Sequence, residues 1–392
     1  MEGFRAKLDY LLKHNKIAYA LFRSIGNVCF RFLGVIFQVD ENTIIFSGHG
    51  RNYNDSPRAI YEYMIKQAEF DKFKFYWALE DPSSVDIPGN CKKIKVDTWE
   101  YFKITLQSHY WVTCVNIERG LHYKKKSNIY LNTWHGTPIK SIAGDNSRKN
   151  DNFSYIDLFC ASGKFEEKIF KKVFSVPKEH LIFTGLPRND ELYNISKKKI
   201  DCLKKELSIS DKKKVILYAP TWRDSLDGGR TYSVKPPINI EKWKKVLGEE
   251  YILLMRTHPY TNKILGIQFD DFVIDMTFYP KINDLFLISD ILISDYSAAI
   301  FDYSILERPI ICFTYDYDEY KSIRGFSLDV ENELPGGLIK TEEEVLNIIL
   351  NKDKKELIKE VKKFKNKYLE YGGNATKECV EALLKKGNYK WR

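Results

Sequence analysis

The sequence predicts an α/β protein with two domains, each built on a mainly parallel sheet. From about residue 40, short apolar runs alternate with amphipathic segments, a pattern typical of βα units. The chain has 392 residues, which is enough for two domains of ordinary size. A lysine-rich segment at residues 197–214 interrupts the alternation and marks the expected boundary.

The apolar runs define the expected elements in order. In the first domain, strands are expected at residues 43–46, 73–79, 110–115, 128–133, 157–161 and 181–184, with helices at 57–69, 98–107 and 164–173. In the second domain, strands are expected at residues 215–219, 251–255, 272–274, 291–294 and 310–313. The expected division is an N-terminal helix (1–39), a first domain (40–195), a second domain (196–355) and C-terminal helices (356–392) that pack back across the junction.

The composition narrows the classes of partner. Hydrophobic residues make up 44% of the chain and charged residues 29%, which describes a globular protein. The 62 Lys and Arg against 53 Asp and Glu give a charge of +9 and favour an anionic partner. The charge is dispersed and no nucleic-acid-binding module is recognisable, which argues against nucleic acid. Seven cysteines without a CxxC pair favour a reducing compartment and suggest no zinc site.

The N-terminal segment predicts an amphipathic basic helix. Between residues 21 and 36 apolar residues recur at helical spacing, while Arg23, Asn27 and Arg31 fall on the other side. The arginines make it a poor membrane-spanning helix, and it lacks the features of a signal peptide. Two interpretations stay open. The helix lies flat on an anionic membrane, or it packs on the first domain.

Two strand ends of the first domain carry candidate functional residues. Gly48 and Gly50 lie in the loop SGHGR, where glycine could let a substrate approach the backbone, but we favour a plain βα turn there, because the loop is not a GxGxxG nucleotide fingerprint. His135 follows the strand at residues 128–133, and ligands of open α/β sheets bind beyond the carboxyl ends of the strands. An imidazole suits general-base work, so we favour a functional His135 over a structural one.

Three strand ends of the second domain carry residues that suit a diphosphate. They are Arg223, then Arg256, Thr257 and His258, and then Asp295 and Ser297 where a helix begins. Guanidiniums, hydroxyls and a helix start offer charge-assisted donors to an anion. Helix caps and surface ion pairs are the alternative explanation. A DxD pattern, Asp316-Tyr317-Asp318, is interpreted as a turn cluster.

Several motifs in order resemble one family. They are GHGRNYNDSPRAIYEYM, WHGTP, TGLPRNDELY, YAPTWRD, RTHP, SDYSAAIFDYSILERP and RGF, spread over about residues 42–340. Together they resemble the CDP-glycerol glycerophosphotransferases of teichoic acid synthesis. The resemblance implies a GT-B fold, in which two Rossmann-like domains face a cleft. It also implies CDP-glycerol as donor, an undecaprenyl diphosphate-linked glycan as acceptor, and peripheral attachment to the cytoplasmic face of the cell membrane. No cofactor is implied with certainty, and a divalent metal stays open.

The resemblance also implies roles for the residues. His135 would be the general base, and His258 would contact the donor diphosphate or the departing CMP. Arg223 and the turn at residues 295–297 would complete the donor site with Arg256 and Thr257. Gly136 and Thr137 of WHGTP, with Gly48 and Gly50, would form loops for the acceptor or the cleft. Ala298 stands where the family usually has a second serine.

The expected reaction transfers glycerol phosphate and releases CMP. The short segment before the transferase core looks most like a priming enzyme, which adds the first glycerol phosphate. Polymerases of glycerol or ribitol phosphate share the same motifs and remain alternatives. A GT-B glycosyltransferase that uses a nucleotide sugar is a further alternative, because the fold alone does not decide the chemistry.

Overall fold

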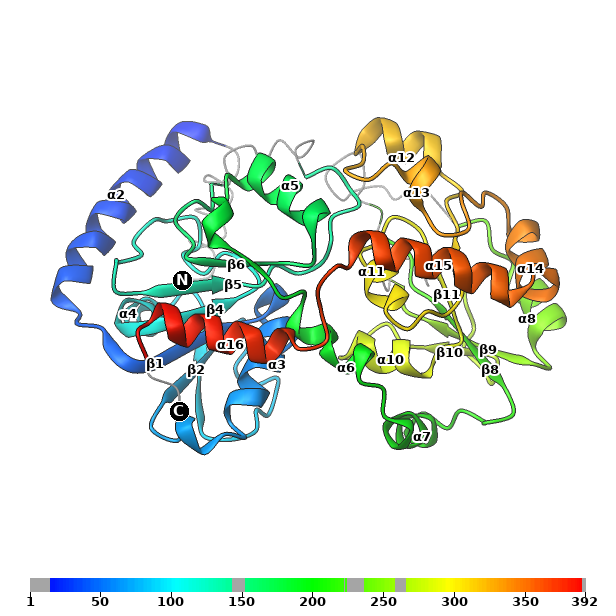
Figure 1. The fold of residues 1–392 in the computed structure, drawn as a ribbon, viewed down its shortest axis with the longest axis horizontal. Coiled ribbons are helices and arrows are strands. Elements are labelled where there is room, and N and C mark those ends of the chain that lie inside the picture. The colour runs from blue at the N-terminus through cyan, green and yellow to red at the C-terminus, as the bar shows by residue number, and fades with distance from the viewer. Residues whose placement is uncertain (1–14, 143–151, 222, 224–235, 258–265, 390–392) are drawn as a thin grey trace. The chain divides into compact units, whose positions relative to one another are not determined.

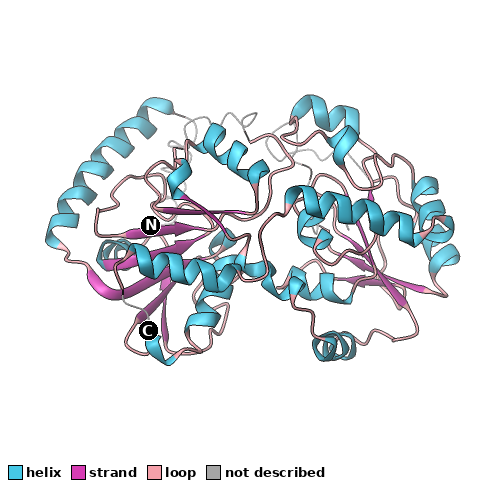
Figure 2. Ribbon diagram, viewed as in Figure 1, coloured by secondary structure: helices cyan, strands magenta, loops and turns pink. Residues whose placement is uncertain are grey.

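The computed structural model describes residues 15–142, 152–221, 223, 236–257 and 266–389. The chain divides into two compact units, and each is described by itself. The first comprises Met1–His135, Ile156–Cys160 and Thr376–Arg392, and the second comprises Gly136–Tyr155 and Ala161–Ala375. Helices and strands alternate in both (Figure 2), which confirms the predicted α/β class.

A seven-stranded sheet begins in the first unit and has the order β3-β2-β1-β4-β5-β6-β7. Figure 1 labels β1, β2, β4, β5 and β6 of this sheet. Its strands are β1 (Asp40–Ser47), β2 (Lys74–Leu79), β3 (Cys91–Lys95), β4 (Ser108–Thr113), β5 (Ile129–Asn132), β6 (Leu158–Ala161) and β7 (Leu181–Phe183). The pairings of β1 with β2 and β4, of β2 with β3, and of β5 with β4 and β6 are parallel. The order reverses direction between β1 and β4, so the sheet has the doubly wound Rossmann arrangement with its crevice beyond these two strands.

The sequence predicted six of these strands and missed β3. Its sequence, CKKIK, contains three lysines and buries one residue, Ile94. Because β3 is an edge strand, its lysines reach solvent and the strand lacks the apolar run that marks the inner strands.

The helices near this sheet connect its strands and return to it at the C-terminus. They are α2 (Lys16–Ile36), α3 (Asp55–Met64), α4 (Trp99–Gln107) and α16 (Ala375–Lys386), with the 3₁₀ turns η1 (His49–Arg51) and η2 (Ala68–Phe70). In α16, the Sγ of Cys379 lies 3.4 Å from the Sγ of Cys160 on β6. The last helix therefore packs on the sheet of the first unit.

The N-terminal helix α2 contacts the first unit through its polar side. Arg23 Nη2 lies 2.9 Å from His122 Nε2, and the Asn27 side chain accepts a hydrogen bond of 2.7 Å from the His122 backbone N–H. Phe30, on the same side, packs against Phe102 with ring centroids 4.6 Å apart. The apolar stripe faces outward and is largely exposed, at Ile17, Leu21, Ile25, Val28, Phe32 and Val35. The helix therefore contacts the first domain, as one of the two interpretations expected, and a contact of its exposed stripe with a membrane stays a prediction.

The second unit contains a five-stranded sheet with the order β10-β9-β8-β11-β12. Its strands are β8 (Lys214–Tyr218), β9 (Tyr251–Met255), β10 (Val273–Asp275), β11 (Ile291–Ser294) and β12 (Ile310–Cys312), all of which the sequence predicted. All four pairings are parallel. The order reverses between β8 and β11, so this sheet repeats the Rossmann arrangement of the first.

The helices of the second unit follow the same alternation. They are α5 (Lys164–Phe174), α6 (Asp190–Tyr193), α7 (Lys197–Glu206), α8 (Ile240–Leu247), α10 (Ile282–Ile288), α11 (Ala299–Ser304), α12 (Tyr317–Ile323), α13 (Val330–Glu333), α14 (Glu342–Asn351) and α15 (Lys354–Tyr368), with the 3₁₀ turns η4 (Lys178–His180) and η5 (Pro187–Asn189).

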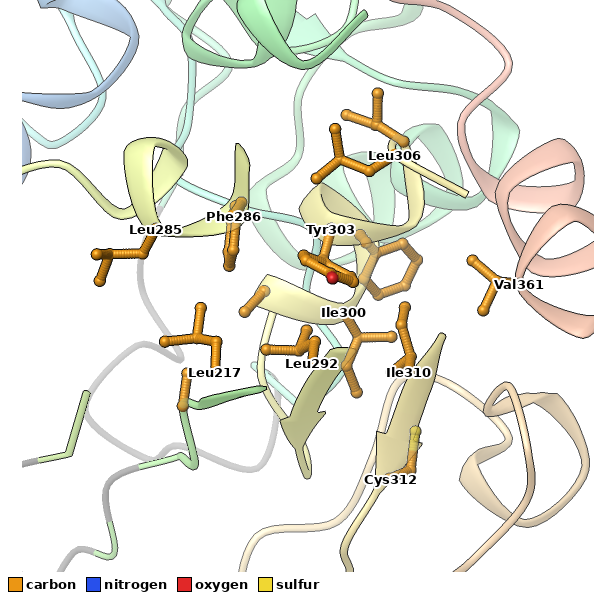
Figure 3. Packing of buried hydrophobic residues seen from close by; sticks show 14 of the residues in the cluster. Leu217, Leu285, Phe286, Leu292, Ile300, Tyr303, Leu306, Ile310, Cys312 and Val361 are labelled. Atoms are coloured by element: carbon orange, nitrogen blue, oxygen red, sulfur yellow. The ribbon is translucent and has the colours of Figure 1, made fainter. Parts of the chain in front are cut away.

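A core of fully buried side chains holds β8, β11 and β12 together. Leu217 of β8, Leu292 of β11 and Ile310 of β12 pack against Phe286 of α10 and Tyr303 of α11 (Figure 3). Each such aliphatic side chain contributes roughly 1.5–3 kcal/mol on burial. Because these strands are parallel, their carboxyl ends lie at the same edge of the sheet. The candidate polar residues of the second unit come directly after these strand ends.

Candidate active site

In the first unit, two loops with candidate residues leave the sheet where its order reverses. The loop after β1 contains Gly48, the exposed His49 and Gly50, and the chain after β4 continues through Cys114. A Cβ on Gly48 would lie 2.2 Å from the carbonyl oxygen of Asn52. The tight fold of the loop itself therefore requires glycine at residue 48. A contact of Gly48 and Gly50 with an acceptor stays a prediction.

His135, which follows β5, is held in one tautomer. Its Nδ1 lies 2.9 Å from the carbonyl oxygen of Cys114. A carbonyl can only accept, so Nδ1 carries the hydrogen and the lone pair of the neutral ring is on Nε2. The ring also contacts Trp134 and His49, with centroids 4.2 Å and 5.0 Å away. His135 is thus half-buried, fixed in orientation, and basic at Nε2, as a general base requires.

The two residues after His135 belong to the second unit and are tightly fixed there. Gly136 has a φ of +139°, and a Cβ on it would lie 2.8 Å from the Cβ of Ala298. The Thr137 hydroxyl donates a 2.6 Å hydrogen bond to Glu166, whose other oxygen accepts from the Ser162 backbone N–H. Burial raises the pKa of Glu166. Thr137 is itself buried, so it anchors the segment after His135. The predicted contact of Gly136 and Thr137 with a substrate stays a prediction.

In the second unit, Arg223 joins the strand ends at the point where the sheet order reverses. Its Nη1 lies 2.7 Å from Asp295, which follows β11. Its Nε and Nη2 donate to the two carboxylate oxygens of Asp316, which follows β12, at 2.6 and 2.9 Å. The side chains of Arg223, Asp295 and Asp316 are 12%, 1% and 6% exposed. They form a buried ion triad, the name used below for these three residues.

The surroundings of the ion triad favour the charged guanidinium. Burial alone would lower the pKa of Arg223, but the charge of Asp295 and the hydrogen bonds to Asp316 outweigh burial and raise it. The guanidinium carbon also lies 5.0–5.4 Å from the ring centres of Tyr320, Tyr296 and Tyr315. Such cation–π contacts add about 0.5–2 kcal/mol each.

The ion triad carries one positive and two negative charges, so its net charge is unfavourable to an anion. Asp295 also accepts hydrogen bonds from the backbone N–H groups of Thr221 and Tyr296, at 2.7 and 2.6 Å. Its carboxylate thereby ties the loop after β8 to the loop after β11. The structure places Arg223 and Asp295 in a positioning role, and their contact with a donor diphosphate stays a prediction.

Arg256, which follows β9, has a different environment. Its Nη1 donates to the carbonyl oxygens of Met276 and Tyr279, at 3.3 and 2.5 Å. Within the described part of the chain no carboxylate is paired with it, and burial lowers its pKa. Arg256 is therefore a half-buried cation that is hydrogen-bonded to neutral carbonyls. Since carbonyls do not cancel its positive charge, that charge suits an incoming phosphate. The next residue, Thr257, is buried, whereas His258 lies outside the described residues.

Ser297 lies directly before Ala298, the N-cap residue of the helix that follows β11. Its hydroxyl accepts a 3.2 Å hydrogen bond from the backbone N–H of Ala299, the first residue of α11. Ser297 therefore has a local role at the start of the helix, close to the capping alternative that the sequence left open. A contact of Ser297 with the donor diphosphate stays a prediction.

Sequence reasoning missed two functional candidates, Asp316 and His49. Asp316 was assigned to a turn, although it follows β12 at the same sheet edge as Asp295, and the strand-end rule applied to it equally. Its DxD partner Asp318 is exposed and pairs with Lys340 at 3.3 Å, so the two carboxylates serve different partners. Among the residues that the structure describes, no group of three His, Cys, Asp or Glu side chains could hold a metal ion.

The chain is similar to proteins of teichoic acid synthesis. A model of the CDP-Glycerol:Poly(glycerophosphate) glycerophosphotransferase family matches residues 29–385. A teichoic acid poly(glycerol phosphate) polymerase of Staphylococcus epidermidis is 36% identical over 320 residues, which cover 76% of this chain and 44% of that protein. The polymerase of the same name from Bacillus spizizenii is 30% identical over 404 residues, covering 96% of this chain and 100% of that protein. The chain thus spans less than half of the first relative and all of the second.

Among solved structures, the chain is similar to the wall teichoic acid polymerase TagF. The TM-score is 0.82 with 29% sequence identity, and the match covers 96% of this chain and 97% of that chain. A TagF variant soaked with CDPG gives a TM-score of 0.81. The similarity agrees with two Rossmann-like units of the GT-B type.

Proposed function

The chain belongs to the CDP-glycerol:poly(glycerophosphate) glycerophosphotransferase family, and from this premise we propose that it transfers glycerol phosphate from CDP-glycerol. The acceptor in this proposal is a polyprenyl diphosphate-linked glycan, the product belongs to teichoic acid or a related surface polymer, and CMP is released. The observation that carries the proposal is His135. Its ring is held through Nδ1 at a sheet crevice, so that Nε2 is the basic atom.

In the proposed reaction, Nε2 of His135 takes the proton of an acceptor hydroxyl. The freed oxygen attacks the glycerol-linked phosphorus, the bond from that phosphorus to the CMP oxygen breaks, and CMP leaves with the bonding electrons. Arg256 supplies positive charge to the phosphoryl oxygens, and His258 and Ser297 are proposed to assist. Such a reaction depends on positioning and electrostatics, because the protein forms no covalent bond to the phosphoryl group.

The number of additions separates two forms of this proposal. A primase adds one glycerol phosphate, as expected from the sequence, whereas a polymerase adds many. The polymerase is the second candidate, because the relative from Bacillus spizizenii matches this chain over its whole length and has that name. Mass spectrometry of the product from CDP-glycerol and a short-chain lipid-linked disaccharide decides between them. A single added mass supports the primase, and a ladder supports the polymerase or its ribitol phosphate counterpart if CDP-ribitol is the donor used.

The proposed location is the cytoplasmic face of the membrane, with α2 lying on an anionic lipid surface. The stripe from Ile17 to Val35 is exposed by 81% and 82% at its two ends, and the polar side of the helix is occupied by the protein. An apolar helix face that the protein leaves uncovered suits the boundary of headgroups and acyl chains. By length and composition, Ile17–Ile36 could also cross a membrane.

Vesicle binding tests this location. The full chain should sediment with anionic vesicles and be released by alkaline carbonate, which leaves spanning helices in place. Glutamate at Ile25, Val28 and Phe32 together should abolish sedimentation. Val246→Glu, on an exposed position of α8, is the matched control and should leave sedimentation intact. Equal sedimentation of the triple variant and the control would reject α2 as the membrane contact.

Release of CMP tests the assignment of His135. His135→Ala should lower the rate of CMP release with acceptor by about 10²–10⁴-fold, the usual contribution of a general base. His180→Ala is the control, because His180 lies in η4 directly before β7, whereas His135 follows the end of β5. A His135→Ala protein that works at the wild-type rate would reject the base assignment.

Thermal shifts with CDP-glycerol and UDP-sugars test the donor, because a ligand raises the stability of the state that binds it.

A further inference from the structure

The first unit brings a second imidazole against His135. The ring of His49, from the loop after β1, lies with its centroid 5.0 Å from that of His135, and the ring planes meet at 38°. The two residues are 86 positions apart in the chain, and β4 lies between their strands in the sheet. The contact therefore depends on the doubly wound strand order and is not a consequence of local sequence.

The two histidines differ in exposure and in what holds them. His135 is half-buried, donates through Nδ1 to the Cys114 carbonyl, and contacts the Trp134 ring at 4.2 Å. His49 is exposed, in a loop where Gly48 is fixed by its close approach to Asn52. Water can hydrate the exposed ring of His49 when it becomes charged, whereas the half-buried ring of His135 is less hydrated. Protonation is therefore less costly on His49 than on His135.

We propose that His49 is a positioning residue for His135, which packs against the ring of the base and takes up the first proton of the pair. This inference rests on the proposed function, in which His135 is the base. Two imidazoles at this distance titrate as a coupled pair, because a proton on one ring opposes a proton on the other. With the first proton on His49, His135 stays neutral to a lower pH and remains able to accept the acceptor proton.

Three ionisable groups among the described residues of the surrounding elements have partners or a fixed protonation state of their own. On the loop of His49, Arg51 donates to the Ser47 hydroxyl and to the Asn116 carbonyl, at 3.3 and 2.5 Å. In the chain after β4, the buried Glu118 accepts hydrogen bonds from two backbone N–H groups, at 2.7 and 2.8 Å. On β5, burial raises the pKa of Tyr130, so its hydroxyl stays neutral across the working range. Cys114, which follows β4, also has an ionisable thiol, and it is buried beside the carbonyl that holds His135.

Two substitutions separate the packing of His49 from its charge. His49→Phe keeps an aromatic ring of similar size and removes the titration. The rate of CMP release at pH 8 should then stay within about threefold of wild type, while the acid limb of the pH–rate profile moves upward by about half a pH unit or more. His49→Ala removes the ring and should lower kcat about tenfold, with KM for CDP-glycerol unchanged, because a misplaced base costs turnover and not donor binding.

A spectroscopic measurement tests the pair without turnover. In the full chain labelled with ¹⁵N-histidine, the resonances of His135 should titrate in two coupled steps, and His49→Phe should reduce them to one step at higher pH. His180→Phe is the control and should leave the His135 titration unchanged. Superimposable His135 titration curves in wild type and His49→Phe, or a kcat for His49→Ala within twofold of wild type, would overturn the proposal.

These outcomes also distinguish the inference from the proposed function. A wild-type protein that releases no CMP from CDP-glycerol would reject the proposed function, although the coupled titration could still be observed. An inactive His135→Ala protein beside fully active His49 variants would reject the inference alone.

Discussion

The two sheets reverse their strand order in the same way, but different side chains follow their strands: imidazoles in the first unit and a buried ion triad in the second. In the first unit, the imidazoles of His49 and His135 follow β1 and β5, on either side of β4, and are held by a backbone carbonyl and by ring contacts. Between β8 and β11 the second unit places the ion triad, in which Arg223 is enclosed by two buried carboxylates. A ring that can gain and lose a proton suits a reacting group, and a guanidinium fixed by two carboxylates suits a scaffold. The same fold position therefore does not imply the same role.

Breaking the ion triad should give the largest effect. Asp316→Ala leaves the buried guanidinium of Arg223 with one carboxylate fewer, and loss of one partner of a buried pair costs about 3–5 kcal/mol. We expect that loss in the free energy of unfolding, measured by urea denaturation. Asp318→Ala is the matched control, because Asp318 is exposed and its ion pair is worth roughly 0–1 kcal/mol. Similar unfolding midpoints for the two variants would show that Arg223 does not depend on Asp316.

Arg256 tests whether the second unit also contains a cation that serves the donor. Arg256→Gln should raise KM for CDP-glycerol by about tenfold or more, since a hydrogen bond to a charged group is worth about 1.5–3 kcal/mol. Arg308→Gln is the control. Arg308 also donates to backbone carbonyls, those of Phe286, Leu287 and Ser289, but it lies directly before β12, at the amino edge of the sheet. If both variants raise KM equally, Arg256 has no special relation to the donor.

Gly136 tests how firmly the segment after the base is held. Gly136→Ala should destabilise the protein by about 1–3 kcal/mol, because the new Cβ would lie 2.8 Å from Ala298 in addition to the strain of a positive φ. Gly337→Ala separates the two causes, since Gly337 has a φ of +74° and a Cβ there would meet no other part of the described chain within 4 Å. Thermal unfolding of both variants measures the difference. Equal losses would mean that the contact with Ala298 contributes nothing.

Glu166 gives the smallest effect and a specific dependence on pH. Burial raises its pKa above 4.5, so the folded chain holds this proton more tightly than the unfolded chain. The free energy of unfolding of the wild type should therefore fall as the pH rises from about 4.5 through the raised pKa. In Glu166→Gln this contribution is absent, and the amide can still accept from Ser162 and donate to Thr137. The variant should differ from wild type by less than about 1 kcal/mol at low pH and gain relative stability as the pH rises. A difference that is independent of pH between 4 and 8 would contradict the assignment.

Much of the fold could be predicted because buried parallel strands are continuous apolar runs. The strands β8 to β12 were all predicted in this way, and β3 was not, because an edge strand exposes its lysines. Helical periodicity likewise predicted two different sides for α2, but it does not determine which side faces the protein. That choice depends on the loop around His122, which supplies hydrogen-bonding partners for Arg23 and Asn27.

The candidate site was predictable as a set of strand ends, but the partner of each side chain was not. His135, Arg223 and Asp295 were found because polar residues follow apolar strands. The enclosure of Arg223 depends on β12 lying next to β11, and the contact of His49 with His135 depends on β4 lying between β1 and β5. Both are consequences of strand order, which local sequence does not encode.

The ion triad also limits how this part of the sequence can change during evolution. Replacing any one of its three residues leaves a buried charge without its counterpart, at a cost of about 3–5 kcal/mol from a total stability that is typically about 5–15 kcal/mol. A protein with a single substitution at residue 223, 295 or 316 should therefore fold poorly, and evolution can change these positions one at a time only through such proteins. We expect these positions to vary together among descendants of this chain, although 93 residues separate the first from the last.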